Sequence, residues 1–297
     1  MIGFRRILCP VDFSEFSRHA LTHAVAMAQR YEGRVTLLYV APLLPSVSTF
    51  PPSVDPVTMD PASPQGLCEE LRAFAGSLRD QVPMDVALLE GDAARQIVEH
   101  ARQGQADLVV MGTHGRSGFE RWVLGSVTEK VLRKAHCPVL TVPRSAPDAE
   151  SGVFHRILCP VDFSSSSLLG VERALSLAEA TKASLTLLHV VQWMAEQELR
   201  EHRHFDVPEF RAYLYRDALR QLRALVPDAA RNWCEPREMV AFGKPWRQVL
   251  QLAANDCSDL IVMGVNGRDA MDLLLFGSTT HHVVREATCP VLTVRGA

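Results

Sequence analysis

Glycine and serine recur at a fixed spacing in two stretches of the chain. In the first stretch, an apolar run over residues 108–111 ends at Gly112, and Gly115, Gly125 and Ser126 follow. Glycine lets the backbone approach a bound anion closely and adopt positive φ. A helix beginning at Ser126 would add unpaired N–H groups and the positive end of its dipole, and both favour negative charge. The stretch therefore predicts a phosphate-binding loop, with ordinary turn glycines and a helix cap as the alternative.

The same spacing returns in the second half of the chain. Gly264, Gly267, Gly277 and Ser278 repeat the pattern G-x2-G-x9-G-S behind another apolar run. The pattern is neither a Walker A loop, which needs GxxxxGK[ST], nor the dinucleotide fingerprint GxGxxG. Because both copies keep all three glycines and the hydroxyl residue, we expect two sites of the same kind.

Both motifs belong to an internal repeat that covers nearly the whole chain. Residues 6–14, which read RILCPVDFS, are identical to residues 156–164 at an offset of 150. Residues 137–142, which read CPVLTV, match residues 289–294 at an offset of 152. A repeat of this length indicates duplication of a whole domain rather than a solenoid of short units.

Each expected domain, 1–145 and 153–297, alternates apolar strand-like runs with helical patterns. Strands that are apolar throughout are buried on both faces, so they predict a mostly parallel sheet between helices. The predicted fold class is α/β, with two tandem Rossmann-like domains that each contain a five-stranded parallel sheet and helices on both faces. In the first domain the strands are expected at residues 6–10, 34–40, 84–89, 107–111 and 139–142. In the second they are expected near residues 156, 184, 238, 259 and 291.

Helix starts carry their own signals. Either Ser14 or Ser17 can cap the first helix, and Asp92 is a good N-cap for the third. Ser126 and Glu129 have the spacing of a capping box. A second helix is expected over residues 66–80, after a proline-rich segment, and a charged, His-rich segment occupies residues 192–208 of the second domain.

Ligands of open α/β sheets bind at the carboxyl ends of the strands, where the strand order reverses. This rule places Asp12, at the end of the first strand, near Gly112, at the end of the fourth. A carboxylate at Asp12 suits a ribose hydroxyl or an adenine amine better than a phosphate, and its alternative role is to cap the next helix. Two motifs distant in sequence thus converge on one crevice.

Composition argues against several functional classes. The chain has 297 residues, of which 47% are hydrophobic and 22% charged, with a net charge of −3. These values suit a globular protein without a nucleic-acid or membrane partner. No apolar run approaches the ~20 residues that span a bilayer, and the first residues do not resemble an export signal, so we expect a cytoplasmic protein. Seven cysteines without a Cys-x-x-Cys pair suit a reducing compartment, and the repeated Cys9 and Cys159 are expected to be small buried hydrophobes.

The glycine spacing, the PVD triplet after the first strand and the five-strand plan together resemble the universal stress protein family, specifically its ATP-binding branch. The resemblance covers both halves and weakens over residues 41–65 and 192–208. It implies the adenine nucleotide alpha hydrolase-like variety of the fold. It also implies an ATP-binding stress-response or regulatory protein with one nucleotide per domain. Because helix dipoles alone do not offset the charge of a polyphosphate, Arg116, Arg268 or a bound Mg²⁺ is expected to help.

The resemblance further assigns roles to individual residues. In the first site the base and ribose would be lined by Pro10, Asp12, Val40 and Met111, and in the second by Pro160, Asp162, Val190 and Met263. The phosphates of the first nucleotide would be wrapped by Gly112, Gly115, Arg116, Gly125, Ser126 and Val127. Those of the second would be wrapped by Gly264, Gly267, Arg268, Gly277, Ser278 and Thr279.

The chain shows no nucleophile–base pair, HExxH motif or kinase signature, so we expect a binding protein and name no catalytic residue. A slow ATPase or phosphotransferase using the same sites is the alternative. A flavin-linked electron carrier is disfavoured by the duplicated glycine motif. No metal site is expected, since a solvated charged face explains the His-rich segment more simply. His281 and His282, soon after Ser278, are either structural or adjacent to phosphate.

Assembly is predicted from the last strand of each half. An edge strand has unpaired backbone groups that invite pairing, and family members commonly dimerise through this strand. We therefore expect a pseudo-twofold association of the two halves through residues 139–142 and 291–294. Homodimerisation of whole chains is also expected, through a surface that the sequence does not identify.

Overall fold

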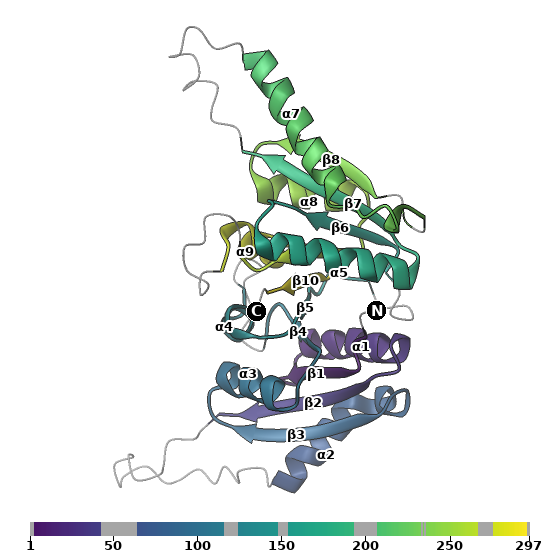
Figure 1. The fold of residues 1–297 in the computed structure, drawn as a ribbon. Coiled ribbons are helices and arrows are strands. Elements are labelled where there is room, and N and C mark those ends of the chain that lie inside the picture. Colours follow the sequence, from purple (N-terminus) through teal and green to yellow (C-terminus); the bar gives the residue numbers. More distant parts are fainter. Residues whose placement is uncertain are drawn as a thin grey trace, which may run out of the picture.

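The computed structural model describes residues 3–42, 64–115, 124–147, 154–192, 207–232, 234, 236–266 and 276–295. These residues form one continuous ten-stranded sheet that runs through both halves of the chain, with helices on both faces (Figure 1). The strand order is β3-β2-β1-β4-β5-β10-β9-β6-β7-β8. The predicted α/β fold is confirmed.

The strands of the first half are β1 (Arg6–Val11), β2 (Arg34–Ala41), β3 (Met84–Glu90), β4 (Leu108–Gly112) and β5 (Val139–Val142). Those of the second half are β6 (Arg156–Pro160), β7 (Ser184–Val191), β8 (Arg237–Phe242), β9 (Leu260–Gly264) and β10 (Val291–Val294). Within each half all pairs are parallel. The strand order reverses between β1 and β4, and between β6 and β9, as the crevice prediction required.

The helices of the first half are α1 (Glu15–Arg30), α2 (Pro64–Ala75), α3 (Ala93–Gln103) and α4 (Ser126–Lys134), with a 3-10 helix η2 (Gly76–Asp80). Those of the second half are α5 (Ser165–Thr181), α7 (Val207–Ala224), α8 (Pro245–Asn255) and α9 (Ser278–Glu286), with a 3-10 helix η3 (Ala230–Asn232). None of the helices in the described ranges is long and apolar enough to cross a bilayer.

Alternate residues along each strand enter two separate cores, one on each face of the sheet. Ile7 and Cys9 belong to the core beneath α1, α2, α5 and α7, whereas Leu8 belongs to the core beneath α3, α4, α8 and α9. Each core contains residues from both halves of the chain. The tandem repeat therefore folds as two domains that share their packing across the middle of the sheet.

The two halves meet where β5 and β10 pair antiparallel, with Leu140 opposite Leu292. The hydroxyl of Thr141 donates to the carbonyl of Val291, and that of Thr293 donates to the carbonyl of Val139, both at 3.2 Å. These two bonds are related by the pseudo-twofold symmetry of the repeat. The predicted pairing of the two halves through their last strands is confirmed.

A further contact crosses this seam on the face that carries α1 and α5. The guanidinium of Arg30, the last residue of α1, donates to the carbonyl of Ala180 near the end of α5. Arg30 and Ala180 occupy equivalent positions of the repeat, at the offset of 150. The pseudo-twofold axis therefore passes close to both residues.

The helix caps test two of the sequence signals. The Ser14 hydroxyl accepts from the N–H of Ser17 at 3.2 Å, and the Asp92 carboxylate accepts from the N–H of Arg95 at 2.8 Å, so both predicted caps are confirmed. The capping box at Ser126 is wrong, since Gly125 is the N-cap and Ser126 is the first helical residue.

The second helix was expected to be continuous over residues 66–80, and this is also wrong. Gly76 has φ of 55°, a left-handed value that a right-handed helix cannot accommodate. The α-helix α2 therefore ends at Ala75 and a 3-10 turn follows. Most of the proline-rich and His-rich segments lies outside the described residues.

Candidate functional site

A cavity of about 280 Å³ lies at the carboxyl ends of β1, β2 and β4 and at the start of α4. Every predicted first-site residue that the structure describes lines it: Pro10, Asp12, Val40, Met111, Gly112, Gly115, Gly125, Ser126 and Val127. Arg116 lies outside the described residues. The two sequence-distant motifs are thus brought together in one cavity.

The cavity also has lining residues that the sequence prediction missed. Tyr39 precedes Val40 on β2, His114 lies between two of the loop glycines, and Ala93 and Ile97 come from α3. His114 could have been included from its position within the glycine motif. The two α3 residues give no such signal, because only the packing of α3 beside β2 places them there.

Asp12 lies directly against the glycine loop. One carboxylate oxygen, Oδ1, accepts from the backbone N–H and the hydroxyl of Ser14, at 3.1 and 2.5 Å. A Cβ at Gly115 would lie 2.6 Å from the other oxygen, Oδ2, which is closer than carbon and oxygen approach. Asp12 is therefore not the helix cap, which is Ser14, and a side chain at residue 115 would have to displace the Asp12 carboxylate.

The glycine loop is closed onto the start of α4 by two hydrogen bonds. The N–H of Gly125 donates to the carbonyl of Thr113 at 2.9 Å, and the hydroxyl of Thr128 donates to the carbonyl of Gly112 at 3.0 Å. Within the described residues no side chain caps α4. The first N–H groups of this helix therefore remain available to an anion in the cavity.

The second half repeats this construction. Asp162 Oδ1 accepts from the N–H and hydroxyl of Ser164 at 3.0 and 2.5 Å. The hydroxyl of Thr280 donates to the carbonyl of Gly264 at 3.0 Å, and the N–H of Gly277 donates to the carbonyl of Val265 at 3.1 Å. The remaining predicted residues follow their repeat positions on β6, β7, β9 and α9: Pro160, Val190, Met263, Ser278 and Thr279. Gly267 and Arg268 lie outside the described residues.

Comparison with known proteins identifies the family. The model of the universal stress protein family matches residues 3–143 and again residues 154–295. The chain belongs to the universal stress protein family.

Two curated relatives are similar to one half of the chain. A universal stress protein of Methanocaldococcus jannaschii is 35% identical over 142 residues, which cover 48% of this chain and 83% of the relative. The stress response protein NhaX of Bacillus subtilis is 30% identical over 160 residues, which cover 46% of this chain and 96% of the relative.

Two solved structures have the same fold over nearly the whole chain. A universal stress protein from Archaeoglobus fulgidus is 22% identical, with a TM-score of 0.70 over 99% of this chain and 98% of that one. A protein from Pseudomonas aeruginosa described as a putative universal stress protein is 17% identical, with a TM-score of 0.65 over 98% of this chain and 93% of that one. Both likenesses concern the fold alone.

Charge differs between the rims of the two sites in this universal stress protein. Beside the first cavity Asp92 forms an ion pair with Lys130 at 3.7 Å. The N–H of Arg95, which donates to Asp92, together with Lys130 and Lys134, holds the pKa of that carboxyl below its usual range. At the equivalent positions the second site carries Lys244 and His282. The ion pair beside the first site is thus replaced by two basic residues beside the second site.

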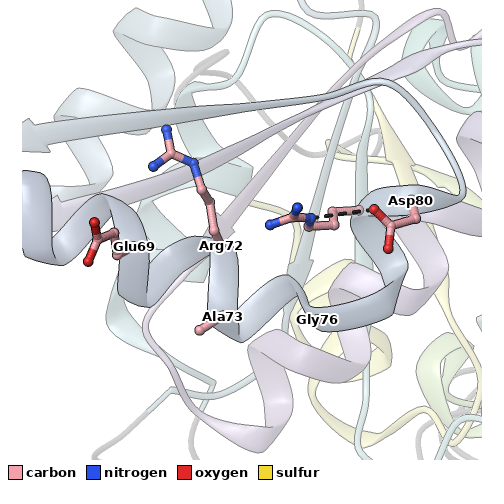
Figure 2. A pocket seen from close by; sticks show the side chains of 6 residues that line it. Glu69, Arg72, Ala73, Gly76 and Asp80 are labelled. Atoms are coloured by element: carbon pink, nitrogen blue, oxygen red, sulfur yellow. Dashed lines mark hydrogen bonds and ion pairs between the residues drawn. The ribbon is translucent and has the colours of Figure 1, made fainter.

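A second hollow lies on the outside of α2 and η2, away from the glycine loops. Figure 2 shows its lining, which includes Glu69, Arg72 and the ion pair of Arg79 with Asp80 at 3.4 Å. Both members of this pair are exposed, and exposed ion pairs contribute little stability. Charges of both signs on an open surface do not form an anion site comparable to the glycine loop.

The cysteines form no disulfide. Cys9 and Cys159 are fully buried in the sheet, and burial raises the pKa of both thiols. Burial also raises the pKa of Cys137 to about 11 and that of Cys289 to about 12. These four thiols are protonated near neutral pH and act as small hydrophobes, as predicted for Cys9 and Cys159.

Proposed function

We propose that this universal stress protein binds one adenine nucleotide in each half, with ATP as the ligand, and acts as a cytoplasmic regulatory protein in the stress response. The observation that supports this most is the first cavity, where the carboxylate of Asp12, the glycine loop and the uncapped start of α4 all meet. Its volume of about 280 Å³ is close to the lower end of the ~300–1,000 Å³ range of ligand pockets.

The chemistry of the cavity supports a definite orientation for the nucleotide. Val40 and Met111 offer apolar surface to the purine, and the Asp12 carboxylate suits a ribose hydroxyl or the adenine amine. The phosphates then point to the glycine loop and Ser126, where backbone N–H groups and the helix dipole favour negative charge. The described lining contains no lysine or arginine, so a Mg²⁺ ion on the phosphates would supply the remaining positive charge.

The same geometry favours binding over rapid catalysis. Asp12 is the one carboxylate among the described lining residues, and Ser14 holds its Oδ1 through two hydrogen bonds. A general base must reach the attacking water within hydrogen-bond distance, and a carboxylate assigned to the ribose is poorly placed for that task. Slow ATP hydrolysis or phosphotransfer at the same sites is the alternative function.

The test counts nucleotides directly. Native mass spectrometry and titration calorimetry, on protein freed of carried-over nucleotide, should give two ATP per chain. The Gly125→Val protein should bind ATP only in the second half, and the Gly277→Val protein only in the first half. The double variant should bind none. Gly125→Ala is a graded control, since its Cβ would lie 3.2 Å from the Thr113 carbonyl and so needs only a small shift.

The comparison ligands are GTP, which changes the base, and cAMP, which is bound in the crystal structure of another universal stress protein. Tighter binding of cAMP than of ATP would show that cAMP, and not ATP, is the preferred ligand. Absence of binding by wild-type protein, or undiminished stoichiometry in folded glycine-to-valine variants, would refute the assignment of the sites.

A further inference from the structure

The helices that begin at the two proposed phosphate sites differ at equivalent positions of their first turns. The offset of 152 aligns Glu129 of α4 with His281 of α9. A carboxylate near a bound polyphosphate opposes binding, whereas an imidazolium favours it. An imidazole is also the side chain that changes charge near neutral pH. The second site therefore carries, in its first helical turn, a group whose charge can change where the first site has a fixed acid.

His281 is half-buried at the start of α9. Its backbone N–H donates to the carbonyl of Gly277, the helix N-cap, at 2.9 Å. Its ring packs edge-on against Phe276 and against His282, with 6.0 Å between centroids in each case. The side chain is therefore held in place within one turn of Ser278, the residue proposed to meet the phosphates.

The charges around His281 come from both halves of the chain. Its own helix contributes His282 and Arg285, and α4 across the seam contributes Glu129 and Arg133. Glu129 accepts a hydrogen bond from Arg133 at 2.8 Å, and the guanidinium of Arg285 donates to Glu286. His281 thus stands one helical turn after Ser278 and within electrostatic reach of Glu129 and Arg133 of the other half.

We propose that nucleotide binding at the second site is coupled to protonation of His281, and that Glu129 tunes this coupling across the seam. The inference rests on the proposed function, because it concerns the regulation of one of the two proposed sites.

The direction of the coupling follows from the surroundings of the ring. Burial lowers the pKa of His281, the nearby Arg285, His282 and Arg133 lower it further, and Glu129 raises it. The imidazole is therefore neutral over more of the range near neutral pH than an ordinary histidine. Phosphates bound at Ser278 add negative charge beside the ring and raise its pKa. Binding then takes up a proton, and affinity increases as the pH falls.

A second imidazole has to be separated from this effect. His114 lines the first cavity, where the second half has Asn266, so the first site has a titratable group of its own. The experiment therefore uses the full-length Gly125→Val protein, in which only the second site binds. Titration calorimetry with ATP at pH 5.5–8.0, repeated in buffers of different ionisation enthalpy, measures the protons taken up on binding.

His281→Gln in this background should remove up to one proton of uptake and flatten the pH dependence of Kd. The lost dependence should amount to about tenfold in Kd for each unit by which binding raises the pKa of His281. His155→Gln is the matched control, since His155 is exposed at the opposite end of β6 and should change nothing. Glu129→Gln removes the carboxylate that favours imidazolium, so it should move the proton uptake to lower pH.

The outcomes separate this inference from the proposed function. Equal proton uptake with and without His281, or a Kd raised equally at every pH by His281→Gln, would overturn the coupling and leave ATP binding intact. If the Glu129→Gln protein takes up protons over the same pH range as the protein with Glu129, the proposed role of Glu129 across the seam is overturned. Failure of the Gly125→Val protein to bind ATP at any pH, while folded, would overturn the second site itself and with it the inference.

Discussion

The glycines that end β4 and β9 allow a quantitative test, because the same substitution meets different neighbours in the two halves. A Cβ at Gly264 would lie 2.7 Å from the carbonyl carbon of Ser166 and 2.8 Å from both its carbonyl and hydroxyl oxygens. A Cβ at Gly112 would lie 3.1 Å from the Cβ and the carbonyl oxygen of Phe16. Comfortable carbon contacts need roughly 3.5–4.0 Å, so only the contact at Gly264 is severe.

The expected energies follow from what has to move. At Gly264 the obstruction is the backbone of the first turn of α5, which Ser164 caps and which cannot yield without loss of that cap. Overpacking of this kind costs ~1–3 kcal/mol, and we expect Gly264→Ala to approach the upper value. At Gly112 a shift of a few tenths of an ångström relieves the contact, so we expect about 1 kcal/mol or less.

Urea denaturation followed by circular dichroism measures both variants, with comparison restricted to transitions of unchanged slope. Calorimetry should show in parallel that Gly264→Ala loses the second nucleotide, because the hydroxyl of Ser166, which donates to the carbonyl of Asn266, is displaced with the helix. Gly112→Ala should keep two sites. Equal destabilisation of the two variants, or a larger effect at Gly112, would refute this reasoning from contacts.

Of four further predictions, one concerns the seam, one the chemistry and two the thiols. Leu140→Pro removes a backbone donor from β5, which has neighbouring strands on both sides, and should therefore disrupt the β5–β10 pairing. Leu140→Val is the control. An unchanged denaturation midpoint in the proline variant would contradict this prediction. Steady-state phosphate release should stay far below the ~10 s⁻¹ typical of enzymes, and a rate near that value that is lost in Asp12→Asn would show an enzyme instead. Iodoacetamide at pH 8 should label exposed Cys257 while buried Cys9 stays unmodified, as read by peptide mass spectrometry. Since burial raises the pKa of Cys137 to about 11 from 9.0, its contribution to stability is complete below pH 9 and should decrease as the pH rises further.

The fold was predictable because its signals are local and repeated. Apolar strands of the right length, caps at Ser14 and Asp92, and an offset between two copies are all properties of the linear sequence. The rule that ligands bind where strand order reverses then brings Asp12 to Gly112 without any knowledge of side-chain packing.

The parts that the sequence did not predict depend on tertiary contacts or on single backbone angles. Ser126 lost the expected cap role because the N–H of Gly125 is bonded to the carbonyl of Thr113, which fixes glycine as the residue before the helix. The positive φ of Gly76 sets the break after α2. Because glycine is also tolerated inside helices, the residue type alone did not predict that the helix ends there. Ala93 and Ile97 line the cavity because α3 packs beside it, and no sequence motif predicts that packing.

The seam has a consequence for how such a protein can change over evolutionary time. When two identical chains associate about a twofold axis, every residue near the axis meets its own copy, and one mutation alters both sides at once. Fusion of the two copies removes that constraint. Arg30 can then face Ala180, and Glu129 can interact electrostatically with His281, whereas a dimer of identical subunits would have to place like beside like. Gene fusion thus lets one half acquire a new property while its partner keeps the old one.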